Sequence, residues 1–186
     1  GFCLVGSEMC IRDRKKGKKF KVECHTTYFS TLRFLNGTII RLTLSFDVIS
    51  HLRNHIELYG DNGSMIVPDP NMFGGSVLIS KKLGSKWSSF KTNKMMLGKI
   101  NIRTQSSRAN ESPTNANYRG VGLSEMIYSI QNKKKNLCSA DLSLHVLNII
   151  DAIHRSAKSG KKQKITILCD QPKPFNLKSI RKITNK

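Results

Sequence analysis

Histidines and acidic residues at short spacings are the first features of this 186-residue chain that invite a chemical interpretation. His51 and His55 are four residues apart, a spacing that metal ligands use on a helix. Asp47 precedes His51 by four residues, so its carboxylate could orient an imidazole acid or base. However, both histidines fall in a predicted connection between strands, and Asp47 ends a strand. We therefore predict no metal site and no catalytic residue in this chain.

The cysteines indicate neither a disulfide framework nor a zinc site. They stand at positions 3, 10, 24, 138 and 169, and they are odd in number and include no CxxC pair. This usage predicts a reducing, cytoplasmic setting. No apolar run reaches the roughly 20 residues that a transmembrane helix requires, so we expect no membrane partner.

Glycine motifs that cradle phosphates do not occur in the sequence. Neither GxGxxG nor GxxxxGK[ST] can be found, and the close pair Gly120 and Gly122 is better explained by the start of a helix. We therefore predict that the chain contains no cofactor-binding residues.

The formal charge of +20, with a pI near 10.1, is unusually high. Such a charge raises nucleic acid as a partner. The basic runs at 14–21, 81–108, 133–135 and 161–164 are accompanied by no RNP, zinc-finger or basic-zipper pattern. We therefore favour a solvated surface and expect no specific nucleic acid. A stand-alone basic nucleic-acid-binding module is the alternative.

Alternating apolar residues in the segment 32–75 predict the elements around which the chain is organised. Period two over 40–46 is typical of a half-buried antiparallel strand. Asn36-Gly37 predicts a two-residue type I′ turn before it, because that turn needs positive φ at both central positions. A second hairpin is expected over 56–67, and it is predicted to turn on Asn-Gly again, at Asp61-Asn62-Gly63. It ends at Pro68, because proline lacks the donor that a central strand requires.

Further strands are predicted at 20–25, 27–35, 77–79, 87–90 and 164–168, with a surface loop at 91–117. Helices are predicted at 121–132 and 139–159, the second capped by Ser139 and stopped by Gly160. Each helix has an apolar stripe: Leu123, Met126, Ile127 and Ile130 in the first, and Leu142, Val146, Ile149, Ile150, Ile153 and Ala157 in the second. Strands followed by helices predict an α+β fold, with a large, mostly antiparallel sheet and helices on one face.

The chain divides into three predicted segments. Residues 1–13 match no periodic pattern, and CLVGSEMCIRDR looks like translated adapter sequence from short-read assembly, so we expect a non-native segment. A genuine disordered N-terminus is the alternative. Residues 14–168 form the domain, and 169–186 are a basic tail.

Four stretches resemble a known family: FLNGTIIRLTLSFDV, IELYGDNGSMIVPDPNMFGG, YRGVGLSEM and SADLSLHVLNIIDAI. They are similar to the C-terminal domain of the Gfo/Idh/MocA oxidoreductases, named after glucose–fructose oxidoreductase and inositol dehydrogenase. The resemblance implies a domain that binds a sugar or polyol and makes oligomer contacts. It also implies a separate N-terminal Rossmann domain that binds NAD or NADP and carries the catalytic residues.

The resemblance predicts that this chain is the substrate-side part of an NAD(P)-dependent oxidoreductase, inactive alone and lacking the nucleotide-binding half. His51 and Arg119 are the candidate substrate-binding residues, because both stand at ends of elements where loops gather. The expected partners are the Rossmann domain and a second copy, which would pack through the sheet.

Overall fold

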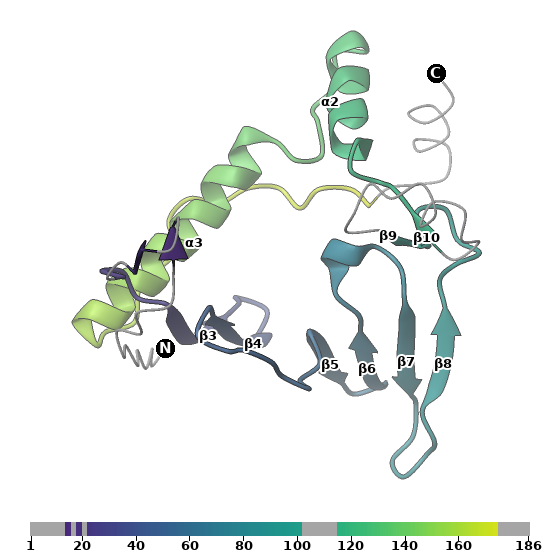
Figure 1. Ribbon diagram of the computed structural model, residues 1–186, viewed down its shortest axis with the longest axis horizontal. Coiled ribbons are helices and arrows are strands. Elements are labelled where there is room, and N and C mark those ends of the chain that lie inside the picture. The colour runs from purple at the N-terminus through teal and green to yellow at the C-terminus, as the bar shows by residue number, and fades with distance from the viewer. Residues whose placement is uncertain (1–13, 16–17, 20–21, 102–114, 175–186) are drawn as a thin grey trace. The chain divides into compact units, whose positions relative to one another are not determined.

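The computed structural model describes residues 14–15, 18–19, 22–101 and 115–174, which form two units (Figure 1). The first unit comprises Gly1–His51 and Ser139–Gln171, and the second comprises Leu52–Cys138 and Pro172–Lys186. Each contains antiparallel strands and one α-helix, so the predicted α+β class is confirmed. The strands form several separate sheets, of which the largest has four strands. The predicted segment 1–13 lies outside the described residues, as does most of the tail.

The main sheet of the first unit is the hairpin of β3 (Thr27–Arg33) and β4 (Ile39–Ser45). A second antiparallel pair joins β1 (Arg14–Lys15) and β2 (Lys18–Lys19). The strand predicted at 20–25 is wrong over its described part, because residues 22–26 have no strand pairing. Side chains of Thr26 and Thr27 instead bond to Asp47, which fastens this segment to the end of β4.

The first hairpin turns through a longer loop than predicted. Phe34 N donates to Thr38 O at 2.9 Å, and Gly37 N donates to Phe34 O at 3.1 Å. Only glycine of the Asn36-Gly37 pair has positive φ, at 88°. These bonds define a three-residue loop with a type I turn followed by a left-handed glycine. The predicted two-residue type I′ turn is therefore wrong, because Asn36 keeps negative φ and its Oδ1 accepts from Thr38 N.

The helix of the first unit, α3 (Ala140–Ser159), begins and ends where the sequence predicts. Ser139 is the N-cap and its Oγ accepts from Leu142 N at 3.3 Å. Gly160 ends the helix in the left-handed conformation, with φ 66°. The side chains of Ala152, Ile153 and Ser156 are buried, so the C-terminal half of the helix contributes most to this unit's core.

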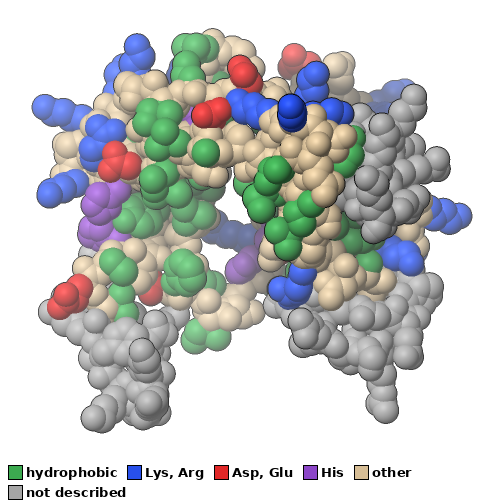
Figure 2. Space-filling view, turned by 90° about the horizontal axis from the view of Figure 1, so that it is seen from above, with side chains coloured by type: hydrophobic (Ala, Val, Ile, Leu, Met, Phe, Trp, Pro, Cys, Tyr) green, Lys and Arg blue, Asp and Glu red, His purple; other side chains and the backbone are tan. Residues whose placement is uncertain are grey.

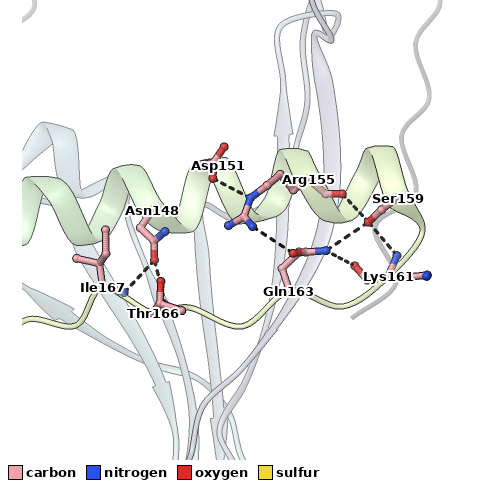
Figure 3. Close-up of polar contacts among 8 residues, drawn as sticks. All are labelled: Asn148, Asp151, Arg155, Ser159, Lys161, Gln163, Thr166 and Ile167. Carbon is pink, nitrogen blue, oxygen red and sulfur yellow. Dashed lines mark hydrogen bonds and ion pairs between the residues drawn. The ribbon is translucent and has the colours of Figure 1, made fainter.

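The segment predicted as a strand at 164–168 runs along α3 and belongs to no sheet (Figure 3). Asn148 Oδ1, on the helix, accepts from Thr166 N and Ile167 N, each at 3.2 Å. His145 Nδ1 lies 2.5 Å from Ile167 O. The strand prediction is wrong because a helix side chain supplies the hydrogen bonds that a neighbouring strand would have supplied.

A second group of polar contacts fixes the return of the chain after α3 (Figure 3). Arg155 Nε donates to Asp151 at 2.8 Å, and its Nη1 donates to Gln163 Oε1 at 3.4 Å. Ser159 Oγ accepts from Lys161 N and from Gln163 Nε2. These bonds join the last turns of the helix to the segment that follows it.

The second unit is built on four antiparallel strands in sequential order: β5 (Ile56–Gly60), β6 (Gly63–Val67), β7 (Ser76–Ser80) and β8 (Ser88–Lys91). The predicted meander is present, and β6 ends directly before Pro68. The turn again differs from the prediction, because Gly60 pairs with Gly63 and leaves Asp61-Asn62 as the loop. Neither loop residue has positive φ, so the turn is not type I′.

The register gives this sheet one apolar face and one mixed face. Residues directly opposite each other in an antiparallel pair share a face. Ile56 pairs with Val67, and Leu58 pairs with Met65, which in turn pairs with Ile79. The other face carries Glu57, Tyr59, Ile66, Leu78, Ser89 and Lys91.

The remaining elements of the second unit are short, apart from one helix. They are η1 (Pro70–Met72), β9 (Ile100–Asn101) and β10 (Asn115–Ala116), the last two paired in parallel. The predicted surface loop at 91–117 lies partly outside the described residues. The helix α2 (Val121–Gln131) buries Glu125 and Ser129 and exposes its apolar stripe of Leu123, Met126, Ile127 and Ile130.

Apolar side chains are uncovered on both units (Figure 2). Within the described residues, the buried hydrophobic side chains are Ala152 and Ile153 alone. Exposed ones include Phe46 at 90% and Leu52 at 103%. No helix in the described ranges is long and apolar enough to cross a membrane.

Candidate functional site

The connection between β6 and β7 contains Phe73, whose backbone conformation is uncommon for a residue other than glycine. Asp69 caps η1 by accepting from Asn71 N at 2.9 Å, and its other carboxylate oxygen lies 3.8 Å from His55 Nε2. Phe73 follows with φ 63°, a conformation that costs a non-glycine residue about 1–3 kcal/mol. Such strain persists only where the surrounding contacts hold it in place.

Three contacts hold Phe73 in this conformation. Its ring lies 5.0 Å from the ring of Tyr118, and its backbone bridges to Ile100. The next residue, Gly74, leaves no room for a side chain, because an added Cβ would stand 2.2 Å from Gly98 O. The close approach of the chain at Gly74 to the chain at Gly98 positions Phe73, whose side chain is 42% exposed.

Asn101 links the same region to the start of α2. Its side chain is buried, and its Oδ1 accepts from Tyr118 N at 2.9 Å. Asn117 Oδ1 accepts from Arg119 N at 3.2 Å, which shapes the turn before the helix. Arg119, a predicted site residue, is exposed beside Tyr118. Phe73, Tyr118 and Arg119 together are called the aromatic–arginine shelf below.

The shelf contains two aromatic rings and an arginine side chain. Aromatic rings pack against the apolar C–H faces of a bound molecule, while arginine binds hydroxyl or carboxylate oxygens. This set of groups can orient a hydroxylated or acidic small molecule.

His51, the other predicted site residue, is exposed in the segment after β4 and belongs to the first unit. Arg119 belongs to the second unit. Asp47, which the sequence placed near His51, accepts from Thr27 Oγ1 at 2.7 Å and from the Thr26 hydroxyl. Its carboxylate therefore holds the base of the first hairpin.

Across the part of the chain that the structure describes, no group of three or more histidine, cysteine or acidic residues is arranged to hold a metal ion. Cys24, Cys138 and Cys169 are free thiols. Glu57 on β5 is exposed, and hydrogen bonds from Asn54 and Tyr59 lower the pKa of its carboxyl. The same carboxylate raises the pKa of Tyr59.

Sequence reasoning missed Phe73, Tyr118 and Asn101. The run PNMFGG marks a turn, but no sequence rule assigns positive φ to phenylalanine. Tyr118 and Asn101 are brought to Phe73 by pairing of strands that are only two residues long, below the length at which periodicity can be detected. Arg119 is the shelf residue that the sequence did single out.

The helices and antiparallel sheets of the two units define an α+β domain. The chain belongs to the Gfo/Idh/MocA C-terminal family, because the family model described as "Oxidoreductase family, C-terminal alpha/beta domain" matches residues 5–167. No curated protein and no solved structure matches the chain. The recognition made from IELYGDNGSMIVPDPNMFGG is therefore confirmed, and the oxidoreductase assignment is confirmed at the level of the domain.

Proposed function

We propose that this chain is the substrate-side domain of an NAD(P)-dependent oxidoreductase that acts on a sugar or polyol. The single observation that carries the proposal is the family match over residues 5–167. A Rossmann domain would hold the dinucleotide, which accepts or donates a hydride when bound. The 186 residues contain no glycine-rich phosphate motif, so the cofactor contacts are assigned to that partner domain.

The aromatic–arginine shelf is proposed as the part of this chain that binds substrate. Arg119 would donate to substrate hydroxyl oxygens, while the rings of Phe73 and Tyr118 would pack against the apolar face of the carbon chain. Its proposed role is orientation, because the catalytic residues are assigned to the Rossmann domain. His51 stays a second candidate for substrate binding, and its support is its exposed position in the segment between β4 and β5.

Partners are proposed on the ground of uncovered apolar surface. An apolar patch of this extent on a folded domain marks an interaction site. One proposed partner is the Rossmann domain. The other is a second copy, packed on the face of the first hairpin that carries Thr31, Arg33, Arg41, Thr43 and Ser45, opposite the face of Tyr28. Phe29 and Ile39 add apolar area to it.

Two measurements test the assignment as an oxidoreductase part. We expect calorimetry on the 186-residue chain to give no saturable binding of NAD(H) or NADP(H). We expect the DNA upstream of codon 1 to encode a glycine-rich βαβ unit. Micromolar dinucleotide binding to the chain alone, or an upstream frame without that unit, would contradict the proposal.

The substrate role is tested in the enzyme that joins this chain to that Rossmann domain. Arg119→Ala is expected to raise KM for the polyol about tenfold or more, since a lost charged hydrogen bond is worth roughly 1.5–3 kcal/mol. Arg53→Ala, which changes another exposed arginine, is the control and should leave KM unchanged. Equal effects of the two substitutions would remove the shelf from the proposal.

The self-association is tested by light scattering at micromolar concentration. A stable interface needs about 1,000 Å² or more of packed contact. Reversing a charge that is buried in such an interface changes its stability, because the charges of the two surfaces must be complementary. Arg41→Glu should change the oligomer, whereas Lys158→Glu on α3 makes the same charge change elsewhere and should not. A monomeric wild-type chain would contradict the sheet-face interface.

A further inference from the structure

Two histidines far apart in sequence lie close together in the first unit. His25, just before β3, and His154, on α3, have ring centroids 5.9 Å apart. Tyr28 lies beside both, at 6.0 Å from His25 and 6.4 Å from His154. Both histidines are exposed, so solvent and solutes reach them. We propose that His25 and His154 form a binding site for a divalent transition-metal ion, with Tyr28 as the positioning residue.

The separation of the rings suits two ligands of one ion. With zinc–nitrogen bonds of about 2.0–2.1 Å, each extended by roughly 1.1 Å from the nitrogen to its ring centre, the two ring centres lie about 5 Å apart at a tetrahedral ion and about 6.4 Å apart at a linear one. The observed 5.9 Å lies within this range. The rings are tilted by 50° to each other, so they do not stack face to face.

Tyr28 determines which nitrogen of His154 is available. The tyrosine hydroxyl lies 3.1 Å from His154 Nδ1. When Nδ1–H donates to this hydroxyl, the lone pair of the neutral ring resides on Nε2, which becomes the metal ligand. Metal-bound histidines commonly donate their second ring nitrogen to such a partner, which fixes the tautomer and the ring orientation.

The donor set selects the class of metal. Imidazole nitrogens suit Zn²⁺, Ni²⁺ and Cu²⁺, whereas Mg²⁺ and Ca²⁺ require oxygen ligands. With two protein ligands, water would complete the coordination, so the site is open and its affinity modest.

The experiment uses the 186-residue chain without a histidine tag, titrated with Zn²⁺ by calorimetry. We expect one saturable site in the wild type. His25→Ala and His154→Ala should each lower the affinity at least tenfold, and Tyr28→Phe should lower it about tenfold, as is usual for partners that orient a ligand. His51→Ala, at another exposed histidine, is the control and should bind as the wild type does.

Three results would overturn the proposal: no saturable binding to the wild type, binding unchanged by both histidine substitutions, or binding abolished by Cys24→Ser while His154→Ala retains it. The last result would assign the zinc to the neighbouring thiol. Since both histidines are exposed, the metal-free variants should keep the wild-type thermal midpoint. Added Zn²⁺ should then raise the midpoint of the wild type and leave that of His154→Ala unchanged. The test is independent of dehydrogenase activity.

Discussion

The two α-helices differ in which of their faces they bury. In α3, Ala152 and Ile153 are buried on the apolar side, and the side chain of Ser139 caps the first turn. In α2, the buried residues are Glu125 and Ser129, and no side chain caps the helix. Glu125 Oε1 accepts from Ser129 Oγ at 2.8 Å and from Leu137 N at 3.1 Å. A hydrogen-bonded carboxylate therefore occupies the place that a leucine would normally take.

The difference shows two ways of stabilising an amphipathic helix. The apolar stripe of α3 is covered by its own unit over its C-terminal half, so the helix is a part of the core. The stripe of α2 stays open, at 42% exposure for Met126 and 70% for Ile130. An open stripe beside a satisfied polar face is typical of a helix that packs against a partner.

The largest expected effect is at the buried apolar residue of α3. Ile153→Ala should lower the free energy of unfolding by about 2–5 kcal/mol, because it removes buried methyl groups and leaves a cavity. Ile150→Ala, at a residue 56% exposed on the same helix, should cost well under half as much. Urea unfolding measures both, and equal losses would show that α3 has no buried side.

The next effect tests whether the polar face of α2 is structural. Glu125→Ala should lower the free energy of unfolding by about 1–3 kcal/mol, because Leu137 N–H and the Ser129 hydroxyl lose their acceptor. Glu125→Gln keeps an acceptor oxygen and should cost less. If the two variants unfold at the same urea concentration, the hydrogen bonds do not stabilise α2.

A smaller effect tests the caps that distinguish the helices. Ser139→Ala should destabilise the domain by about 1 kcal/mol, because Leu142 N–H loses the side-chain acceptor. Ser139→Asp keeps the acceptor and is the control. A thermal midpoint that does not fall in Ser139→Ala would show that α3 does not depend on its cap.

The smallest expected effect is on the pH dependence of stability, and it concerns the exposed carboxylate of Glu57 on β5, in contrast to the buried one of Glu125 on α2. The lowered pKa of Glu57 means that its contribution is fully present above the ordinary glutamate range and is lost as pH falls through the folded-state pKa. Tyr59 has a raised pKa, so its contribution to stability is present below the ordinary tyrosine range and is lost as pH rises through the folded-state pKa. Glu57→Gln should flatten the acid slope slightly when the thermal midpoint is measured against pH.

Local chemistry made several elements predictable. Ser139 and Gly160 predicted both ends of α3, because a cap and a left-handed glycine act within one turn. Period two predicted β4, and Pro68 predicted the end of β6. The two hairpin loops were mispredicted for one reason: Asn-Gly permits a type I′ turn, but the pairing of the strands decides how many residues, and which ones, remain in the loop.

The sequence by itself determined the α+β class and the boundaries of the main elements, because these depend on periodicity, caps and turn residues close together along the chain. The family was recognised from the resemblance of four stretches of sequence, such as IELYGDNGSMIVPDPNMFGG. The tertiary structure alone decided the contacts between distant segments. It brought Phe73 to Tyr118 and His25 to His154, and it turned the 164–168 segment toward Asn148. It also buried the side of α2 that carries Glu125, whose carboxylate accepts from Leu137 N–H and from the Ser129 hydroxyl.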